Sequence, residues 1–150
     1  MKYLLVIAVV AGSLYQLYLP KLTDESVRRF MDDMQIAEQM KDYSRVEEMF
    51  TDTVKVSIRR GNADSVKTTN ISSSQLVAVM KKLHQPEYEY VSDLKIKDIQ
   101  ILSDKAIVAT DETLWMTVEG SRFKKRTQGL LTLIVEGFDI KITEVKDYAH

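Results

Sequence analysis

The sequence predicts an α+β fold in which three N-terminal helices pack on a strongly curved, mostly antiparallel sheet. Apolar residues recur at helical spacing only upstream of residue 85, whereas four long runs rich in β-branched and aromatic residues occupy the last third of the chain. A sheet of that size needs a second layer to cover one of its faces. The N-terminal half is therefore expected to fold back over the sheet.

Composition limits the classes of function. The chain has 150 residues, 45% of them hydrophobic and 29% charged, as expected of one globular domain with an appendage. Its 21 basic and 22 acidic residues give a net charge of -1, so no global field attracts nucleic acid. With no cysteine and two histidines, neither disulfides, thiolate nucleophiles nor a histidine-rich metal site is expected. We expect no cofactor and no metal.

The N-terminus indicates export. Met1 and Lys2 are followed by YLLVIAVV and then AGS, a basic start, an apolar core and small residues. Residues 1–20 are either a signal peptide cleaved after Ser13 or a membrane anchor, in which residues 3–19 cross the inner membrane as a helix. Both alternatives place the domain, residues 21–150, in the periplasm or elsewhere outside the cytoplasm.

Three segments of the N-terminal half have helical periodicity. The first covers residues 24–41, with Thr23 as its N-cap and a stripe that includes Val27, Phe30, Met31 and Met34, and Glu38 lies elsewhere round this helix. The second is short, residues 43–50, and the third covers residues 75–84, capped by the serines at 72–74. Between them, residues 53–59 alternate as a strand, and the polar segment 61–74 is predicted to be a loop.

The last third predicts four antiparallel strands within residues 88–101, 105–118, 123–135 and 140–148. In the first of these runs the apolar parity shifts after Ile96, which predicts a bulge near Lys97 and Asp98. Long strands with bulges curve, and a curved sheet can hold a pocket against helices.

Three stretches carry a resemblance to a known family. They are DYSRVEEMFTDTVKVSI at 42–58, DIQILSDKAIVATDETLWMTV at 98–118 and GLLTLIVEGFDIKITEVKDY at 129–148. Together with the order of the elements, they resemble the nuclear transport factor two-like superfamily, also called SnoaL-like or cystatin-like, over residues 23–148. The resemblance implies that the helices and sheet form a cone. Because this fold includes enzymes, binders and scaffold domains, it does not imply one activity.

Two enzymatic activities of the superfamily can be compared with the residues. Ketosteroid isomerases have a carboxylate base near the end of the first strand, where this chain reads VKVSIRRG, so isomerase chemistry is disfavoured. Epoxide hydrolases of this fold activate water with an Asp, Arg, Asp set. Asp111, Arg59 and Asp139 are the only residues that we match to that set.

The strands carry the candidate ligand-binding residues. One of Asp111 and Glu112 must face the covered side of the sheet, either as a pocket acid or as a charge paired across strands with Arg126 or Lys124. Aromatic side chains in the strands either line a pocket or fill the core. His84 is interpreted as a partner of the helix dipole rather than a base. The full candidate set is Tyr90, Asp111, Glu112, Trp115 and Thr127.

Two functions remain open. The leading hypothesis is a non-enzymatic exported or membrane-tethered domain that binds an envelope protein partner or a small apolar ligand in its cone. The alternative is a small-molecule enzyme, a cyclase, isomerase or hydratase, acting in the cone pocket. In either case we expect a homodimer formed through the sheet face.

Overall fold

The computed structural model of the protein describes residues 19–59 and 66–149. The predicted signal or anchor, residues 1–20, lies almost wholly outside these residues. In the described part of the chain no helix combines the length and the hydrophobicity that crossing a bilayer requires.

In the part of the chain that the structure describes, three helices and one short 3-10 turn accompany the sheet. The helices are α2 (Asp24–Gln39), α3 (Tyr43–Glu48) and α4 (Ser73–Leu83), and η1 (Pro86–Tyr88) follows α4. Thr23 caps α2 as predicted, because its hydroxyl accepts a hydrogen bond from the Ser26 amide at 3.1 Å while the Ser26 hydroxyl accepts one from the Thr23 amide at 2.9 Å. Ser72 and Gln75 cap α4 in the same reciprocal way.

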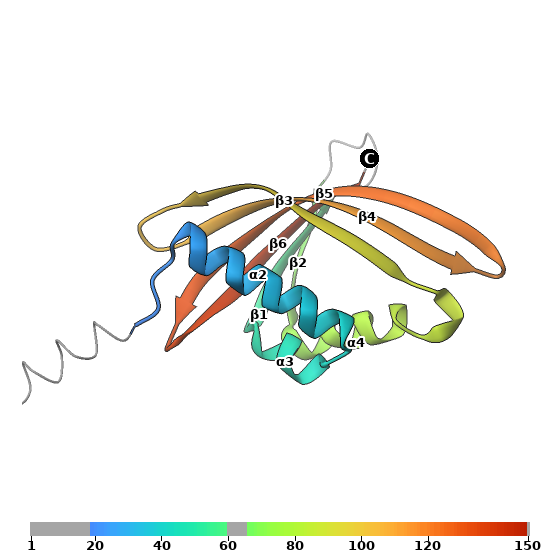
Figure 1. The fold of residues 1–150 in the computed structure, drawn as a ribbon, viewed down its shortest axis with the longest axis horizontal. Helices are drawn as coiled ribbons and strands as arrows, with labels where there is room; N and C mark the ends of the chain where they lie inside the picture. Colours follow the sequence, from blue (N-terminus) through green and yellow to red (C-terminus); the bar gives the residue numbers. More distant parts are fainter. Residues whose placement is uncertain (1–18, 60–65, 150) are drawn as a thin grey trace, which may run out of the picture.

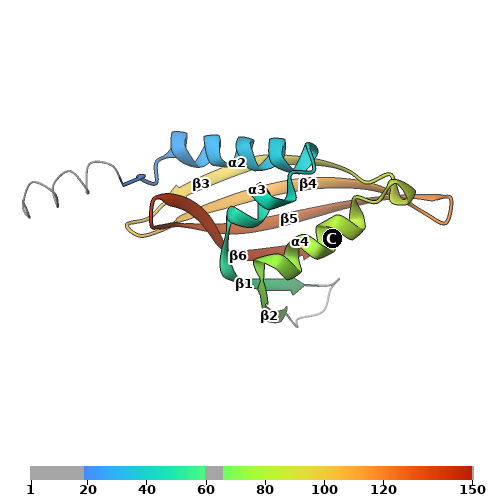
Figure 2. The ribbon, with the colours of Figure 1, turned by 90° about the horizontal axis from the view of Figure 1, so that it is seen from below.

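The sheet has six strands in the order β2-β1-β6-β5-β4-β3. All neighbours are antiparallel except β1 and β6, which are parallel. The sheet curves over the helices, all of which lie on its concave side (Figures 1 and 2). The strands are β1 (Phe50–Arg59), β2 (Val66–Ser72), β3 (Val91–Ile101), β4 (Ala106–Val118), β5 (Ser121–Glu136) and β6 (Asp139–Ala149).

Two local predictions have opposite outcomes. The bulge near Lys97 and Asp98 is confirmed, since the register of β3 on β4 shifts between Ile96 and Asp98. The prediction of a loop throughout 61–74 is wrong, because residues 66–72 form β2, an edge strand paired with β1. Most of β2 is exposed, so its sequence does not need to alternate between apolar and polar residues. Its backbone pairing with β1 determines its conformation.

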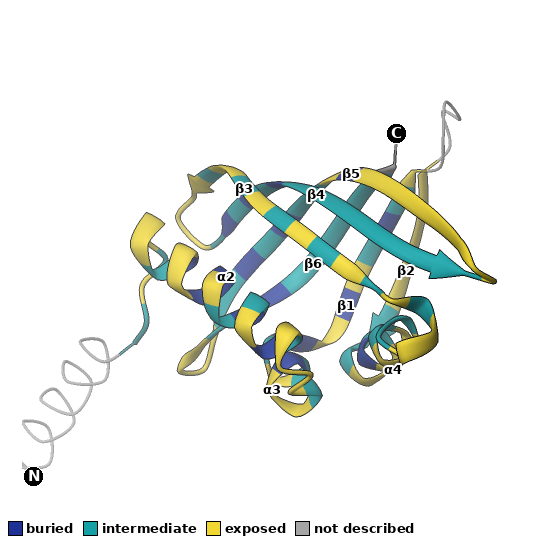
Figure 3. Cartoon of the chain, turned by 45° about the vertical axis from the view of Figure 1, so that its right-hand side comes forward, coloured by how far each residue is buried: buried dark blue, intermediate teal, exposed yellow. Residues whose placement is uncertain are grey.

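The core lies between the concave face and the helices, where the buried parts of the strands in Figure 3 lie opposite the helices. Along β4 the buried residues Ala106, Val108 and Thr110 alternate with less buried ones, and this parity defines the concave face. The fully buried large side chains are Met31, Leu133, Ile142, Val27, Val46, Val54 and Val108.

Candidate functional site

Helix α2 supplies one wall of a pocket. Its buried stripe includes Met31 and Met34, and Glu38 follows Met31 by seven residues and Met34 by four. Residues at these spacings share a helix face, so Glu38 lies at the border of the stripe rather than elsewhere round the helix, where we predicted it from the sequence. Only 25% of its side chain is exposed.

The end of α4 supplies the opposite wall. His84 is the C-cap of α4, and Pro86 begins η1 two residues later. Glu89 then adopts a left-handed conformation with φ of 40°, and this turn directs the chain into β3. The segment between α4 and β3 thereby brings His84 and Tyr90 to the side of α2 that carries Glu38, and the two rings lie 4.9 Å apart between centroids.

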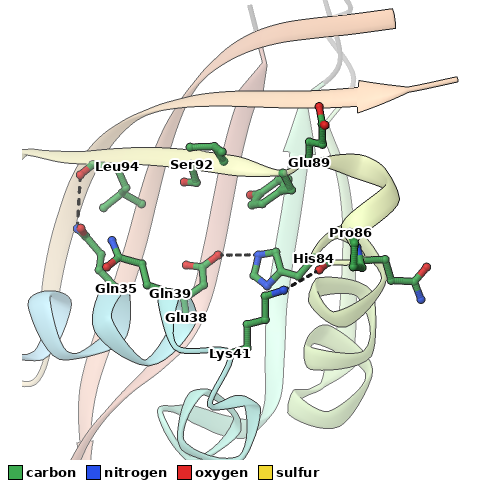
Figure 4. A pocket seen from close by; sticks show the side chains of 12 residues that line it. Gln35, Glu38, Gln39, Lys41, His84, Pro86, Glu89, Ser92 and Leu94 are labelled. Carbon is green, nitrogen blue, oxygen red and sulfur yellow. Dashed lines mark hydrogen bonds and ion pairs between the residues drawn. The ribbon is translucent and has the colours of Figure 1, made fainter. Parts of the chain in front are cut away.

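These elements enclose a cavity of about 370 Å³, which falls within the usual range for small-molecule sites. Figure 4 shows side chains from α2, from the end of α4 and from β3 converging on it. The residues that line it are Gln35, Glu38, Gln39, Lys41, His84, Gln85, Pro86, Glu89, Tyr90, Val91, Ser92 and Leu94.

A chain of polar contacts crosses the floor of this pocket. The Tyr43 hydroxyl lies 3.1 Å from His84 Nδ1. On the other side of the ring, His84 Nε2 lies 3.4 Å from Glu38 Oε1 (Figure 4). With an uncharged imidazole, two arrangements of protons satisfy both contacts. Either Tyr43 donates to Nδ1 and Nε2–H donates to a Glu38 carboxylate, or Nδ1–H donates to Tyr43 and a protonated Glu38 donates to Nε2. Adding a proton to Glu38 therefore changes the tautomer of His84.

Burial shifts the pKa values of Glu38 and His84 in opposite directions. Loss of water, followed by repulsion from Glu112, raises the pKa of Glu38 to about 7. Loss of water, followed by repulsion from Lys41, lowers the pKa of His84. Near neutral pH the imidazole is thus uncharged, and the proton that exchanges at this pair is the one on Glu38. The interpretation of His84 as a cationic partner of the helix dipole is therefore not supported.

The sheet contributes a second polar group behind the pocket wall. The Ser92 hydroxyl donates a hydrogen bond to Glu112 Oε1, and burial raises the pKa of Glu112. Thr127 is paired with Glu112 in register and is only 4% exposed. One row further along the strands, Asp147 is paired with Gly129, and its Oδ1 atom is buried without a hydrogen-bond partner among the described residues. Burial raises the pKa of Asp147 as well.

The structure separates the five predicted site residues into two groups. Tyr90 lines the pocket, and Glu112 and Thr127 lie behind it on the concave face. Asp111 and Trp115 have the opposite parity on β4 and lie on the other face of the sheet. Glu112 is therefore the carboxylate that faces the covered side.

On the opposite face, Asp111 pairs with Arg126, which is the cross-strand alternative weighed from the sequence. The hydrogen bonds from Arg126 hold the pKa of Asp111 below its usual value. Lys124 Nζ lies 5.8 Å from the centre of the Trp115 ring. Neither Asp111 nor Trp115 lines the pocket beside Glu38.

The epoxide-hydrolase set is not assembled. Arg59 lies 5.5 Å from the ring centre of Tyr148 near the end of β6, whereas Asp139 begins β6. Tyr148 follows Asp139 by nine positions along the strand, a length of up to about 30 Å. Asp111 faces away from the concave side, so the three groups cannot act on one substrate.

A second pocket of about 500 Å³ lies on the other side of α2, against the β5–β6 hairpin. Its charged groups include Arg29, Asp33, Arg45 and Lys141. Arg45 and Asp33 are paired at 3.6 Å, with 46% of each side chain exposed. Lys141 is paired with Glu136 at 3.1 Å, so these charges already have partners. We place the functional site at the Glu38 pocket, where a largely buried carboxyl group contacts a buried imidazole. Within the described residues, no group of three or more His, Asp or Glu side chains is placed to hold a metal ion.

The chain was compared with known proteins. No protein-family model matches it, and no curated protein matches it in sequence. Many solved structures share its fold. An NTF2-like protein with a cystatin-like fold from Novosphingobium aromaticivorans superposes with a TM-score of 0.64 at 10% identity, covering 93% of this chain and 87% of that one.

Two further structures show the range of proteins with this fold. The CaMKII hub of S. rosetta has a TM-score of 0.66 at 13% identity, covering 88% of this chain and 100% of the hub. A ketosteroid isomerase-like protein from Erwinia carotovora atroseptica has a TM-score of 0.60 at 14% identity, covering 81% and 92%. The expected resemblance is thus confirmed in three dimensions, and the chain has the NTF2-like, cystatin-like fold.

Proposed function

We propose that this protein is an exported domain, either secreted or tethered to the membrane, that binds a small ligand in the pocket between α2, the end of α4 and β3. One observation carries the proposal. Glu38, a carboxyl group with its pKa raised to about 7, lies against the buried imidazole of His84 in a cavity of about 370 Å³. Ionisable groups with shifted pKa values in a cavity are typical of functional sites. Pro86, Val91 and Leu94 give the same cavity apolar surface.

A substitution that fills the pocket tests the proposal. Gln39 is an exposed residue of α2 that lines the cavity, so Gln39→Trp should occupy the pocket without disturbing the core. Native mass spectrometry of the full chain, purified from the cells that make it, should detect a co-purifying small molecule that the variant lacks. Asp32→Trp is the matched control, since Asp32 is exposed on the same helix and does not line the pocket. A pocket that stays empty in the unsubstituted protein would contradict the proposal.

A second candidate function is supported by the contacts of His84. A carboxyl group with a pKa near 7, joined through His84 to Tyr43, is suited to general acid–base catalysis on a small molecule. Enzymes are among the proteins that share this fold, including the β subunit of the benzoate 1,2-dioxygenase from Burkholderia mallei. In such an enzyme, Glu38 would be the group that removes a proton from the substrate or donates one to it.

Hydrogen exchange at the ligand separates the two functions. In D2O, a base at Glu38 that removes a carbon-bound proton from the ligand would return deuterium to that carbon, which mass spectrometry detects. Glu38→Gln should bind the ligand and leave its carbon-bound hydrogens in place. A binding domain shows no exchange in either protein.

The proposals on location and assembly have their own support. The apolar run at residues 3–19 supports export, and an intact-mass measurement on the native protein determines whether it is cleaved.

We propose a homodimer through the sheet face that carries Trp115, and the hub and association-domain proteins of the same fold support self-association. Sedimentation that shows only monomer at high concentration would contradict it.

A further inference from the structure

One of the largely buried ionisable groups of the pocket is an acid. The side chain of Glu38 is 25% exposed, and the other ionisable residues that line the cavity in the described structure are Lys41, His84, Glu89 and Tyr90. Burial keeps His84 uncharged near neutral pH. Lys41 is an exposed residue whose Nζ donates to the His84 carbonyl oxygen at 3.2 Å, so its charge lies at the rim. Among the described residues that line the cavity, Lys41 is therefore the only cation near neutral pH, and its ammonium group is bonded to the His84 carbonyl oxygen rather than to Glu38.

The sheet behind the pocket adds negative charge. Glu112 repels Glu38 through the wall formed by Ser92, and Asp147 in turn repels Glu112. Lys125 on β5 offsets part of this charge at both Glu112 and Asp147. The Oδ1 atom of Asp147 nevertheless remains buried without a hydrogen-bond partner. An anionic ligand in the cavity would be repelled by these groups, whereas a cation would be attracted.

The aromatic side chain in the pocket lining also favours a cation over an anion. Tyr90 lines the cavity, with 4.9 Å between the centroids of the Tyr90 and His84 rings. The faces of aromatic rings attract organic cations, and more strongly where water is excluded. Pro86, Val91 and Leu94 are available to cover an apolar body.

We propose that the ligand of this pocket is a small organic amine, whose ammonium group pairs with Glu38 beside Tyr90 and whose apolar body lies against Leu94 and Val91. The inference rests on the proposed ligand-binding function and specifies the class of ligand. A cavity of about 370 Å³ limits that ligand to a small molecule.

Binding of an amine at this position displaces a proton. The charged and titratable groups around Glu38 are Lys41 in the turn after α2, Tyr43 on α3, His84 at the end of α4, Tyr90 before β3 and Glu112 on β4. An ammonium group beside Glu38 favours the carboxylate and so lowers its pKa. At pH 7, where about half of the Glu38 carboxyls are protonated, binding should release about half a proton per site.

The experiment uses the full chain and three probes of nearly equal shape: benzylamine, benzyl alcohol and benzoate. Dissociation constants are measured by protein-observed NMR, from the shifts of the Tyr90 and His84 ring resonances. We expect benzylamine to bind at least about tenfold more tightly than benzyl alcohol, and benzoate to bind most weakly. Calorimetry of benzylamine binding in two buffers of different ionisation enthalpy should report the released proton.

Two variants identify the group responsible. Glu38→Gln should remove both the preference for benzylamine and the proton release, while benzyl alcohol binds as before. Glu89→Gln removes an exposed carboxylate of the same pocket, bonded to Thr117, and should preserve the proton release. Loss of the preference in Glu89→Gln but not in Glu38→Gln would overturn the assignment.

The outcomes also separate this inference from the proposed function. If benzyl alcohol or benzoate binds as tightly as benzylamine, the pocket binds ligands but the amine inference is overturned. If a co-purifying ligand displaced by Gln39→Trp contains no basic nitrogen, the inference is overturned in the same way. If none of the three probes shifts the pocket resonances and nothing co-purifies, the ligand-binding function itself is overturned.

Discussion

Replacing Glu38 by Gln should make the protein more stable at alkaline pH. Burial raises the pKa of Glu38 from the usual 4.5 to about 7 in the folded state. Below pH 4.5 the carboxyl is protonated in both the folded and the unfolded chain, so it contributes no pH dependence. Between pH 4.5 and about 7 the unfolded chain loses the proton while the folded chain keeps it, so the free energy of unfolding falls as pH rises. Above about pH 7 the loss is complete.

The size of the effect follows from the width of this window. Each pH unit between the two pKa values corresponds to about 1.4 kcal/mol, so the window corresponds to about 3 kcal/mol. The side chain is only 25% exposed, so solvent screens little of this cost. Gln cannot ionise, yet it keeps a donor and an acceptor for His84. Glu38→Gln should therefore exceed the unsubstituted protein in stability by about 3 kcal/mol at pH 8.5 and differ by less than about 0.5 kcal/mol at pH 4.5.

Urea denaturation between pH 4.5 and 8.5, followed by circular dichroism, measures this difference. His84 titrates in both proteins, so its contribution largely cancels in the comparison. Glu25→Gln on the same helix is the control, because the Glu25 side chain is 83% exposed and its substitution makes the same chemical change outside the pocket. A Glu38→Gln difference that is constant across the pH range would refute the burial argument for Glu38.

Three further substitutions test the packing. Gly129→Ala should destabilise the protein by about 1–3 kcal/mol in urea denaturation. The reason is that a Cβ there would lie 2.8 Å from Thr110 Oγ1 and 3.3 Å from the Lys146 carbonyl oxygen. Adding Thr110→Ala should recover part of that loss, and no recovery would show that Thr110 is not the obstacle. Met31→Ala removes a side chain that is fully buried and should lower the free energy of unfolding by about 2–5 kcal/mol, so a loss below about 1 kcal/mol would contradict its placement in the core. Ser72→Ala deletes the acceptor for the Gln75 amide at 3.2 Å and should lower the thermal unfolding midpoint by an amount equivalent to about 1 kcal/mol, whereas Ser72→Asp should not.

Local patterns in the sequence were sufficient to predict most of the fold. Thr23 and the Met31 stripe identify α2, and the parity shift beyond Ile96 identifies the bulge in β3. The strand β2 was missed because an exposed edge strand carries no alternation of burial. Its Val66, the threonines and Ile71 were a signal of β propensity that the neighbouring polar residues obscured.

The candidate site was harder to predict because it forms only in three dimensions. Glu112 and Tyr90 could be selected from single strands, by parity and by residue type. Glu38 and His84 lie 46 positions apart, and each has an ordinary local explanation, a charge on a helix and a helix end. One local signal was present: Glu38 continues the spacing of the buried Met31 and Met34, which places a carboxyl group on the buried side of α2.

The position of β6 has a consequence for how this chain folds. β6 lies between β1 and β5, so without it the sheet would be divided into a two-stranded and a three-stranded piece. Its parallel pairing joins Lys55 to Glu144 and Ile58 to Asp147, across most of the length of the domain. Contacts at such sequence separation form late and slowly, because a long loop must close first. The nascent chain therefore remains without its complete sheet until the β6 residues are synthesised, and a chain that crosses a membrane unfolded would meet the same condition on the far side.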